Sequence, residues 1–403
     1  MLRYEIKKVF SKSKNRMAVI VLFVILVITS VLTINKVEYV DEKGNHFVGI
    51  SAARDLREAK NEWKGYLTED TLSKALEENR TINNSKEALS DDITEQNKAY
   101  AKKQGIVSII DVISQAFSEY RDYNYYAADN VSDDEVGAIY ERRISALKEW
   151  FDSGEETFTQ EEKDFMIQKY EDLETPFYYE YMDGWAALLQ NISTFILILA
   201  LVIGFFVSGI FSDEFQAKAD SIFFSTRFGR SRGISAKVGA GFCITTGFYV
   251  IFVLLYTLIV LFVLGVDGAN CPIQLDLWRS VYNITFLQAY LFIVLGGYIG
   301  TIFASTLAML VSALTRSTPT AIIVPFIVLC AFPFLSRIIT LPGLCSFFPD
   351  QLLEIYLDIK EAGLVTLGGK VTTIATVIVP VYAVICLILL PVLYKVYKKT
   401  EIK

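Results

Sequence analysis

Six long apolar segments without a single charged side chain constrain the fold of this chain more than any other feature. They cover residues 17–34, 185–211, 238–266, 285–314, 318–336 and 371–394. All 38 basic and 45 acidic residues lie outside these segments, although the 403-residue chain is 53% hydrophobic. A helix of about 20 apolar residues can cross a bilayer, whereas a soluble protein's helix of that length keeps a polar face. The sequence therefore predicts an all-α polytopic membrane protein with six transmembrane helices.

The distribution of Lys and Arg predicts the orientation of these spans. With six spans, residues 1–16, 211–237, 315–317 and 395–403 share one side of the membrane, and they hold 16 basic and 5 acidic residues. The other side holds 22 basic and 40 acidic residues. Because an excess of Lys and Arg marks cytoplasmic loops, both termini, including the tail 395–403, are expected to be cytoplasmic. The expected location is a bacterial plasma membrane, crossed several times.

The first sixteen residues are expected to form a cytoplasmic amphipathic helix ahead of the first span. Leu2, Ile6, Val9 and Phe10 recur at helical spacing with lysines between them, as in helices that lie on a membrane surface. A charged flank without regular structure is the alternative. A cleaved signal peptide is disfavoured, because segment 17–34 is longer than a usual signal core and residues 31–35 offer no small-x-small cleavage site.

Two further segments are expected on the extracellular side. Residues 35–184 contain 34 acidic and 18 basic residues and read as a mainly helical extracellular domain. Ser132 with Glu135 and Thr159 with Glu162 have the spacing of capping boxes, which mark helix starts. The aromatic residues just before position 185 are typical of a membrane-interface belt, with contact to a substrate as the alternative. Residues 337–370 are expected to include an outer amphipathic segment over 346–370.

The residues that carry catalysis or bind metals are almost absent. The single histidine, His46, lies in a polar stretch, so no His-based metal site or catalytic pair is expected. Cys271 and Cys345 lie in outer loops, where they either pair or stay unpaired. The stretch GLVTLGGKV at 363–371 resembles a P-loop but lacks its first glycine and its Ser/Thr. We therefore expect no catalytic residue, metal or cofactor in this chain, and no nucleic-acid partner.

The loop between the second and third spans has an unusual composition for its position. Residues 213–237 read DEFQAKADSIFFSTRFGRSRGISAK, with five basic and three acidic residues between two apolar spans. This order of an acid, a hydrophobic stretch, Ser-Thr, Gly-Arg and a closing Lys resembles the ABC-2 type permease family of ABC exporters. The matching residues are Glu214, Ser225, Thr226, Gly229, Arg230 and Lys237. The sequence departs from the family pattern at Ala219-Asp220 and at Phe228.

The resemblance implies a permease subunit that is not itself an enzyme. Two such chains, identical or homologous, would form the pathway in the bilayer, and two ABC ATPase subunits beneath them would bind ATP and Mg. Loop 212–237 would be the coupling element, with Phe223, Phe224 and Arg230 expected to carry most of the contact with the ATPase. The full set of expected coupling residues is Glu214, Phe215, Phe223, Phe224, Arg227, Gly229, Arg230 and Lys237.

Other readings of the sequence remain open. Gly296 and Gly300 form a G-x-x-x-G pair, for which close packing within the chain is favoured over a dimer seam. A secondary transporter or channel is the alternative function, disfavoured because the six segments lack the carboxylates that ion-coupled carriers place at membrane depth. A membrane-anchored sensor with an extracellular ligand-binding domain is a further alternative. Uncharged spans suit an amphipathic cargo, such as a peptide, lipid or drug.

Overall fold

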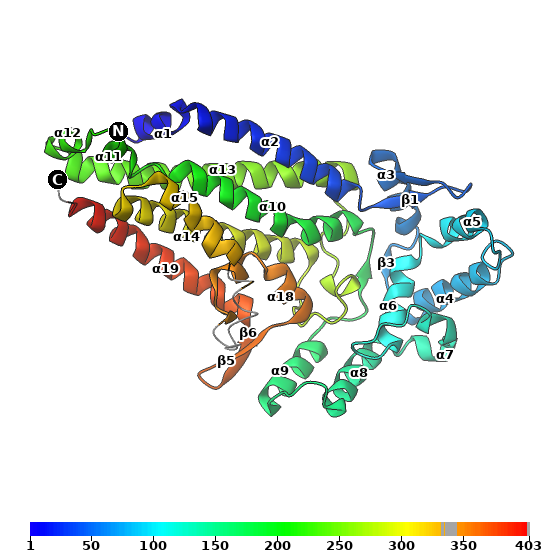
Figure 1. Cartoon of the computed structure of the whole chain (residues 1–403). Helices are drawn as coiled ribbons and strands as arrows, with labels where there is room; N and C mark the ends of the chain where they lie inside the picture. The colour runs from blue at the N-terminus through cyan, green and yellow to red at the C-terminus, as the bar shows by residue number, and fades with distance from the viewer. Residues whose placement is uncertain (332–333, 335–344, 401–403) are drawn as a thin grey trace.

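The computed structural model describes residues 1–331, 334 and 345–400 of the chain. Within this part, five helices are long and apolar enough to cross a membrane, and they lie side by side as one bundle (Figure 1). The expectation of an all-α polytopic membrane protein is confirmed. The five helices are α2 (Ser13–Ile34), α10 (Asp183–Val207), α13 (Ile234–Leu264), α14 (Phe286–Thr315) and α19 (Ile374–Lys398).

The fifth expected span, 318–336, is described only in part. It begins as α15 (Thr318–Phe326) and continues as η4 (Ile327–Ala331), whereas residues 332–333 and 335–336 lie outside the described part of the chain. The described piece is apolar but shorter than the roughly 20 residues that a spanning helix needs. It packs on α10 where Gly204 leaves room, since a Cβ there would lie 2.4 Å from Cγ of Pro325.

Helix α10 lies at the centre of the bundle and packs against α2, α13, α14 and α15. Its Phe195 stacks on Tyr256 of α13 with ring centroids 4.5 Å apart. The Tyr256 hydroxyl in turn shares a 2.6 Å hydrogen bond with Thr33 of α2. These two hydroxyls at membrane depth thus pair with each other. Helices α2 and α19 turn large apolar side chains such as Val24 and Leu387 outward. Lipid would cover this apolar surface of α2 and α19.

The insert between α2 and α10 forms a separate layer at one end of the bundle, and both chain termini lie at the other end (Figure 1). We call these the insert end and the terminal end. The insert consists of short helices around the apolar helix α6, and both predicted capping boxes are present. Its helices are α3 (Ile50–Asn61), α4 (Glu69–Asn83), α5 (Ile93–Lys103), α6 (Val107–Phe117), η1 (Ala127–Asn130), α7 (Asp133–Val136), α8 (Ile139–Ser153) and α9 (Gln160–Glu171).

In the described part of the chain, three two-stranded antiparallel sheets accompany the helices. The pairs are β1 (Glu38–Val40) with β2 (His46–Val48), β3 (Gly65–Tyr66) with β4 (Tyr178–Tyr179), and β5 (Leu364–Leu367) with β6 (Lys370–Thr373). The stretch GLVTLGGKV therefore forms a hairpin, whose turn uses Gly368 and Gly369 at positive φ (+58° and +78°). Two successive positive φ angles suit a tight hairpin turn and favour glycine. The described part of the outer segment also contains η5 (Pro349–Leu352) and α18 (Ile355–Glu361).

The insert is tied to the bundle by buried and partly buried polar contacts. Arg143 of α8, only 3% exposed, donates to the carbonyl oxygens of Trp278 (3.0 Å) and Ser280 (2.8 Å) in the loop between α13 and α14. Lys60 of α3 pairs with Asp183 at the start of α10, with 2.6 Å between nitrogen and oxygen. These contacts hold the insert against the ends of the central helices.

Candidate functional site

The loop between α10 and α13 folds into three short helical pieces at the terminal end of the bundle (Figure 1). They are α11 (Asp213–Gln216), α12 (Asp220–Ser225) and η2 (Gly229–Gly233). Asp213 and Asp220 begin the first two pieces, where a negative charge favours the helix start. Gly229 is required for the return of the chain, because a Cβ at this position would lie 1.8 Å from the carbonyl oxygen of Phe223.

A buried lysine organises the charges of this end. Lys237, with 0% of its side chain exposed, lies in the first turn of α13. Its Nζ donates to Oε1 of Glu214 (2.7 Å) and to the carbonyl oxygen of Ile210 (2.7 Å), and lies 3.2 Å from Oε2 of Glu5. A buried ammonium is stable only when it is paired and hydrogen-bonded, as this one is. Lys237 thus joins α1 (Leu2–Ser11), α11 and α13.

Glu214 receives a second cation from α1. Lys8 Nζ lies 2.5 Å from Oε1 of Glu214. Burial on its own would raise the pKa of Glu214, but Lys237 and Lys8 outweigh that effect and hold the pKa below its ordinary value. Beside this pair, Lys12 contacts Asp213. Glu214 is therefore charged at neutral pH, and the ion pairs of Glu214 with Lys8 and of Asp213 with Lys12 hold α1 against the loop.

The apolar side of α1 packs on the bundle. Val9 is buried, and the ring of Phe10 lies 5.5 Å from that of Phe206 in α10 and 5.4 Å from that of Phe248 in α13. Between α1 and α2, Asn15 donates from its buried side chain to the carbonyl oxygen of Val9 at 2.7 Å. Residues 2–11 are helical and are anchored by protein contacts, but α1 ends before Lys12 and α2 begins at Ser13, so the segment 1–16 is not one continuous helix.

The aromatic residues of the loop form a cluster that includes the end of α19. Tyr397, fully buried, lies at its centre, with ring centroids 4.8 Å from Phe211, 5.2 Å from Phe224 and 6.2 Å from Phe223. Phe224 is only 5% exposed. Of the two phenylalanines expected to contact a partner, the structure thus places Phe224 inside the chain's own core and leaves Phe223 half-buried.

Arg230 is also engaged within the chain. Its guanidinium lies 4.7 Å from the ring centroid of Phe224 and donates to the carbonyl oxygens of Lys398 (2.8 Å) and Thr400 (3.1 Å). It thereby caps the last turn of α19, whose final carbonyls have no partner in the helix. Phe215 of α11 completes the same cluster, with its ring 6.1 Å from Tyr397. Arg230 and Phe215 thus stabilise the loop through contacts with α19.

A different set of side chains faces outward from the loop. Ile222 is 68% exposed and Phe228 is 38% exposed. The exposed Arg227 and Arg232 flank Phe228, with their guanidinium carbons 5.3 Å and 4.9 Å from its ring centroid. We call these four residues the outward face. Sequence reasoning included Arg227 but omitted Arg232, and it treated Phe228 only as a departure from the family pattern.

The glycine pair of α14 serves contacts within the chain. A Cβ on Gly296 would lie 2.0 Å from Cδ1 of Ile355, and one on Gly300 would lie 3.2 Å from Cβ of Leu352. Both glycines therefore face η5 and α18, which approach α14 closely because these positions lack side chains. The neighbouring Gly297, which the pattern did not single out, faces Ile196 of α10.

The described residues contain no cluster of three or more His, Cys, Asp or Glu side chains that could hold a metal ion.

A family model described as ABC-2 family transporter protein matches residues 16–355 of the chain. The comparisons with curated proteins and with solved structures give no match. The family match covers the loop, the bundle up to α14 and α15, and the insert.

Proposed function

Because this chain belongs to the ABC-2 family of transporter proteins, we propose that it is the membrane subunit of an ATP-driven exporter. In this proposal a separate ABC ATPase binds at the terminal end, two copies of each subunit assemble, and the cargo leaves at the insert end. The terminal end is then cytoplasmic, in agreement with its excess of basic residues.

The observation that carries this proposal is the construction of the loop. A connector between two spans needs no ordered charge cluster, whereas this loop has a buried lysine, a paired carboxylate and an aromatic core that hold it rigid. The loop exposes two apolar side chains to solvent, Ile222 and Phe228, and arginines flank the ring of Phe228. Large apolar groups and arginines are the residues that most often dominate a protein interface.

Within this proposal, the exposure of each side chain suggests which residues contact the ATPase. Phe224 and Arg230 already have partners within the chain, so we assign them to holding the loop in shape. Ile222, Arg227, Phe228 and Arg232 have the exposure that a partner contact requires. Glu214 and Lys237 are proposed to act indirectly as well. Their ion pair fixes the position of α11 relative to α13, so they do not need to contact the ATPase themselves.

The test is co-purification of the chain with each ABC ATPase of its source organism. Ile222→Ala/Phe228→Ala should weaken binding of the cognate ATPase by at least about tenfold, since interface anchors cost more than ~1 kcal/mol each when truncated. The chain alone should not bind ATP. A matched control, Phe47→Ala/Ile93→Ala, truncates an exposed phenylalanine and an exposed isoleucine on the insert and should leave binding unchanged.

Phe224→Ala separates the two roles. Removing this buried ring should lower the stability of the chain by roughly 3–5 kcal/mol, as truncation of buried phenylalanines does. The proposal fails if no ABC ATPase co-purifies, or if the isolated chain binds ATP tightly. An unchanged affinity in Ile222→Ala/Phe228→Ala would show that the ATPase contacts another surface.

A further inference from the structure

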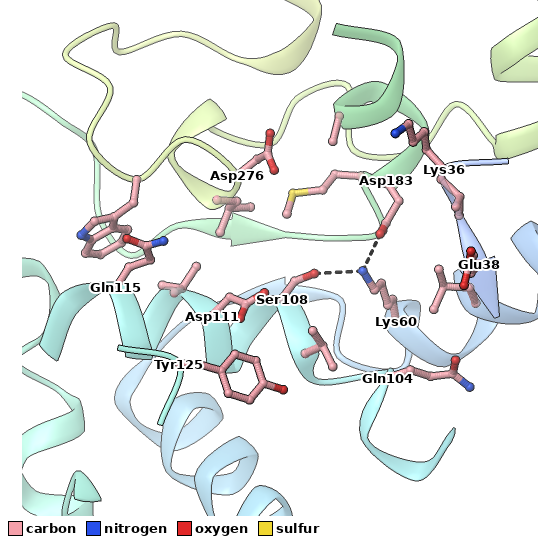
Figure 2. A pocket seen from close by; sticks show the side chains of 18 of the residues that line it. Lys36, Glu38, Lys60, Gln104, Ser108, Asp111, Gln115, Tyr125, Asp183 and Asp276 are labelled. Atoms are coloured by element: carbon pink, nitrogen blue, oxygen red, sulfur yellow. Dashed lines mark hydrogen bonds and ion pairs between the residues drawn. The ribbon is translucent and has the colours of Figure 1, made fainter. Parts of the chain in front are cut away.

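A cavity of about 680 Å³ lies between the insert and the ends of α2 and α10. Figure 2 shows it from close by, with charged and polar side chains converging from several elements. Helices α3 and α6 of the insert form one wall, and the start of α10 and the η3 loop (η3, Ile273–Leu275) form the other. A volume of this order suits a drug-sized ligand rather than a single ion.

Four carboxylates line the cavity, and one of them is paired with a lysine. Asp183 pairs with Lys60 at 2.6 Å, and Lys60 also donates to Oγ of Ser108 at 2.9 Å (Figure 2). Glu38 lies at the exposed rim, where its Oε2 is 3.2 Å from Nδ1 of His46. The other two carboxylates belong to Asp111 and Asp276. The interior of the cavity is therefore negative.

Asp276 is an unusual residue in this wall. It projects from the η3 loop toward the cavity (Figure 2). No side-chain hydrogen bond or ion pair joins it to the described residues. It is accessible through the cavity, but the protein around it and the charge of Asp183 raise its pKa to about 6. An unpaired carboxylate in such a place is a cost to stability and a common feature of binding sites.

The unsatisfied atoms of the lining are acceptors. Among the described residues that line the cavity, two buried side-chain atoms lack a hydrogen-bond partner, Oδ2 of Asp183 and Oε1 of Gln274. Both atoms are covered by protein, so a ligand in the cavity would not touch them directly, but their oxygens add to the negative potential of this wall. The accessible carboxylates of Asp276 and Asp111 therefore favour a ligand that carries positive charge and donates hydrogen bonds.

Aromatic rings complete the wall. Tyr123 and Tyr125 are 42% and 48% exposed, and the hydroxyl of Tyr123 donates to Oδ1 of Asp111 at 3.0 Å. Tyr100 and Trp278 also line the cavity. Ring faces next to carboxylates attract ammonium and guanidinium groups. A metal ion fits less well, since no three ligating side chains come together in the described residues.

We propose that this cavity binds the ammonium or guanidinium group of an amphipathic organic cation, held between Asp276 and Asp111 with the tyrosines against its apolar part. Its identification as the exporter's cargo site rests on the proposed function. The binding itself needs no ATPase, so it is measured independently.

The test uses the full chain in lipid nanodiscs and a matched pair of fluorescent probes. Dansylcadaverine carries a primary amine, and its N-acetyl derivative has the same body without the charge. At pH 7.5 the amine should bind at least about tenfold more tightly than the acetylated probe, because hydrogen bonds to charged groups are the stronger ones. Asp276→Asn and Asp111→Asn should each weaken binding of the amine by about tenfold and leave the acetylated probe unaffected.

The control is Asp122→Asn, which removes the same charge from an exposed site of the insert outside this cavity. It should leave the affinity unchanged. Equal binding of the two probes, or an undiminished affinity in Asp276→Asn, would overturn the proposal. A failure to bind either probe would also overturn it, while leaving the co-purification of an ATPase as a separate question.

Discussion

Replacing Lys237 tests whether the buried charge cluster holds the terminal end together. In Lys237→Met the side chain keeps a similar length but loses its contacts with Glu214, Ile210 and Glu5. Glu214 is 6% exposed, and its Oε2 has no hydrogen-bond partner among the residues that the structure describes. The substitution therefore leaves a buried carboxylate with Lys8 as its remaining cation, at a side chain that is itself 41% exposed.

The size of the effect follows from these contacts. Removing one partner of a buried ion pair costs about 3–5 kcal/mol, and the retained Lys8 places this case near the lower limit, at about 3 kcal/mol. Removing both charges in Lys237→Met/Glu214→Gln should restore most of that loss, because a neutral pair needs no compensation. Lys74→Met is the control. Its ion pair with Asp70 is exposed and should matter little.

The assay is the midpoint of thermal unfolding of the purified chain in detergent, followed by intrinsic fluorescence at one fixed heating rate. A loss of about 3 kcal/mol corresponds to a fall of several degrees, since 1 kcal/mol shifts the midpoint by roughly 2–4 °C in chains of 150–250 residues. A fixed rate is needed because such proteins often unfold irreversibly. An unchanged midpoint in Lys237→Met, or a double variant as unstable as the sum of the single ones, would refute the reasoning.

The pH dependence of this cluster has a definite sign. The pKa of Glu214 is lowered in the folded chain, so its contribution to stability is present above the unfolded pKa. That contribution is lost as the pH falls through the lower, folded pKa. The difference between wild type and Lys237→Met should therefore be largest at neutral pH and shrink in acid.

Two further predictions concern the insert end. If it is extracellular, an impermeant thiol reagent on intact cells should label Ser90→Cys but not Ser13→Cys, with the wild-type chain as control for the native cysteines; the reverse pattern would invert the topology. Because the pKa of Asp276 is raised to about 6, the folded chain holds its proton where the unfolded chain has lost it, so stability falls as the pH rises toward 6. Asp276→Asn should accordingly raise the unfolding midpoint at pH 8, and this gain should shrink as the pH falls toward about 4; no gain at pH 8 would contradict the assignment. The charged groups that act on Asp276 are Asp183, Lys60, Lys360 and Asp111.

The membrane helices could be predicted from the sequence because the signal is local. A charge-free apolar stretch of this length has few folds open to it, and five of the six predicted spans correspond to long helices. The capping boxes at Ser132 and Thr159 are local signals as well, and both are present. The helix expected after Ser132 is divided into α7 and α8. That break depends on close packing, since Gly137 lies against Glu69 of α4.

The roles within the loop could not be predicted because they depend on residues far away in the chain. Nothing near Phe224 indicates that Tyr397 will cover it, and nothing near Arg230 indicates that it will cap α19. Likewise, Lys8 reaches Glu214 across 206 positions. The sequence prediction selected Phe223, Phe224 and Arg230 as partner contacts from their residue type alone. Exposure, which decides between a partner contact and a core contact, becomes known only once the helices are placed.

The two candidate sites lie at opposite ends of the same two helices. Helix α10 starts at Asp183, which pairs with Lys60 beside the cavity, and it leads directly into Asp213 and Glu214 of the loop. Helix α13 carries Lys237 of the buried cluster in its first turn and ends at Leu264, three residues before Asp267, which pairs with Arg57 of the insert at 2.6 Å.

Both helices rise about 1.5 Å per residue, so each spans roughly 35–45 Å without interruption. A displacement of the loop by an ATPase would therefore reach the cavity through these two rigid helices and their terminal ion pairs. Arg57 and Lys60 lie on one helix, α3, so both paths converge on the wall that faces Asp276. Coupling between the two ends of the molecule would thus be concentrated at α3. Substitution of Arg57 would break one of the two paths and leave the cavity lining intact.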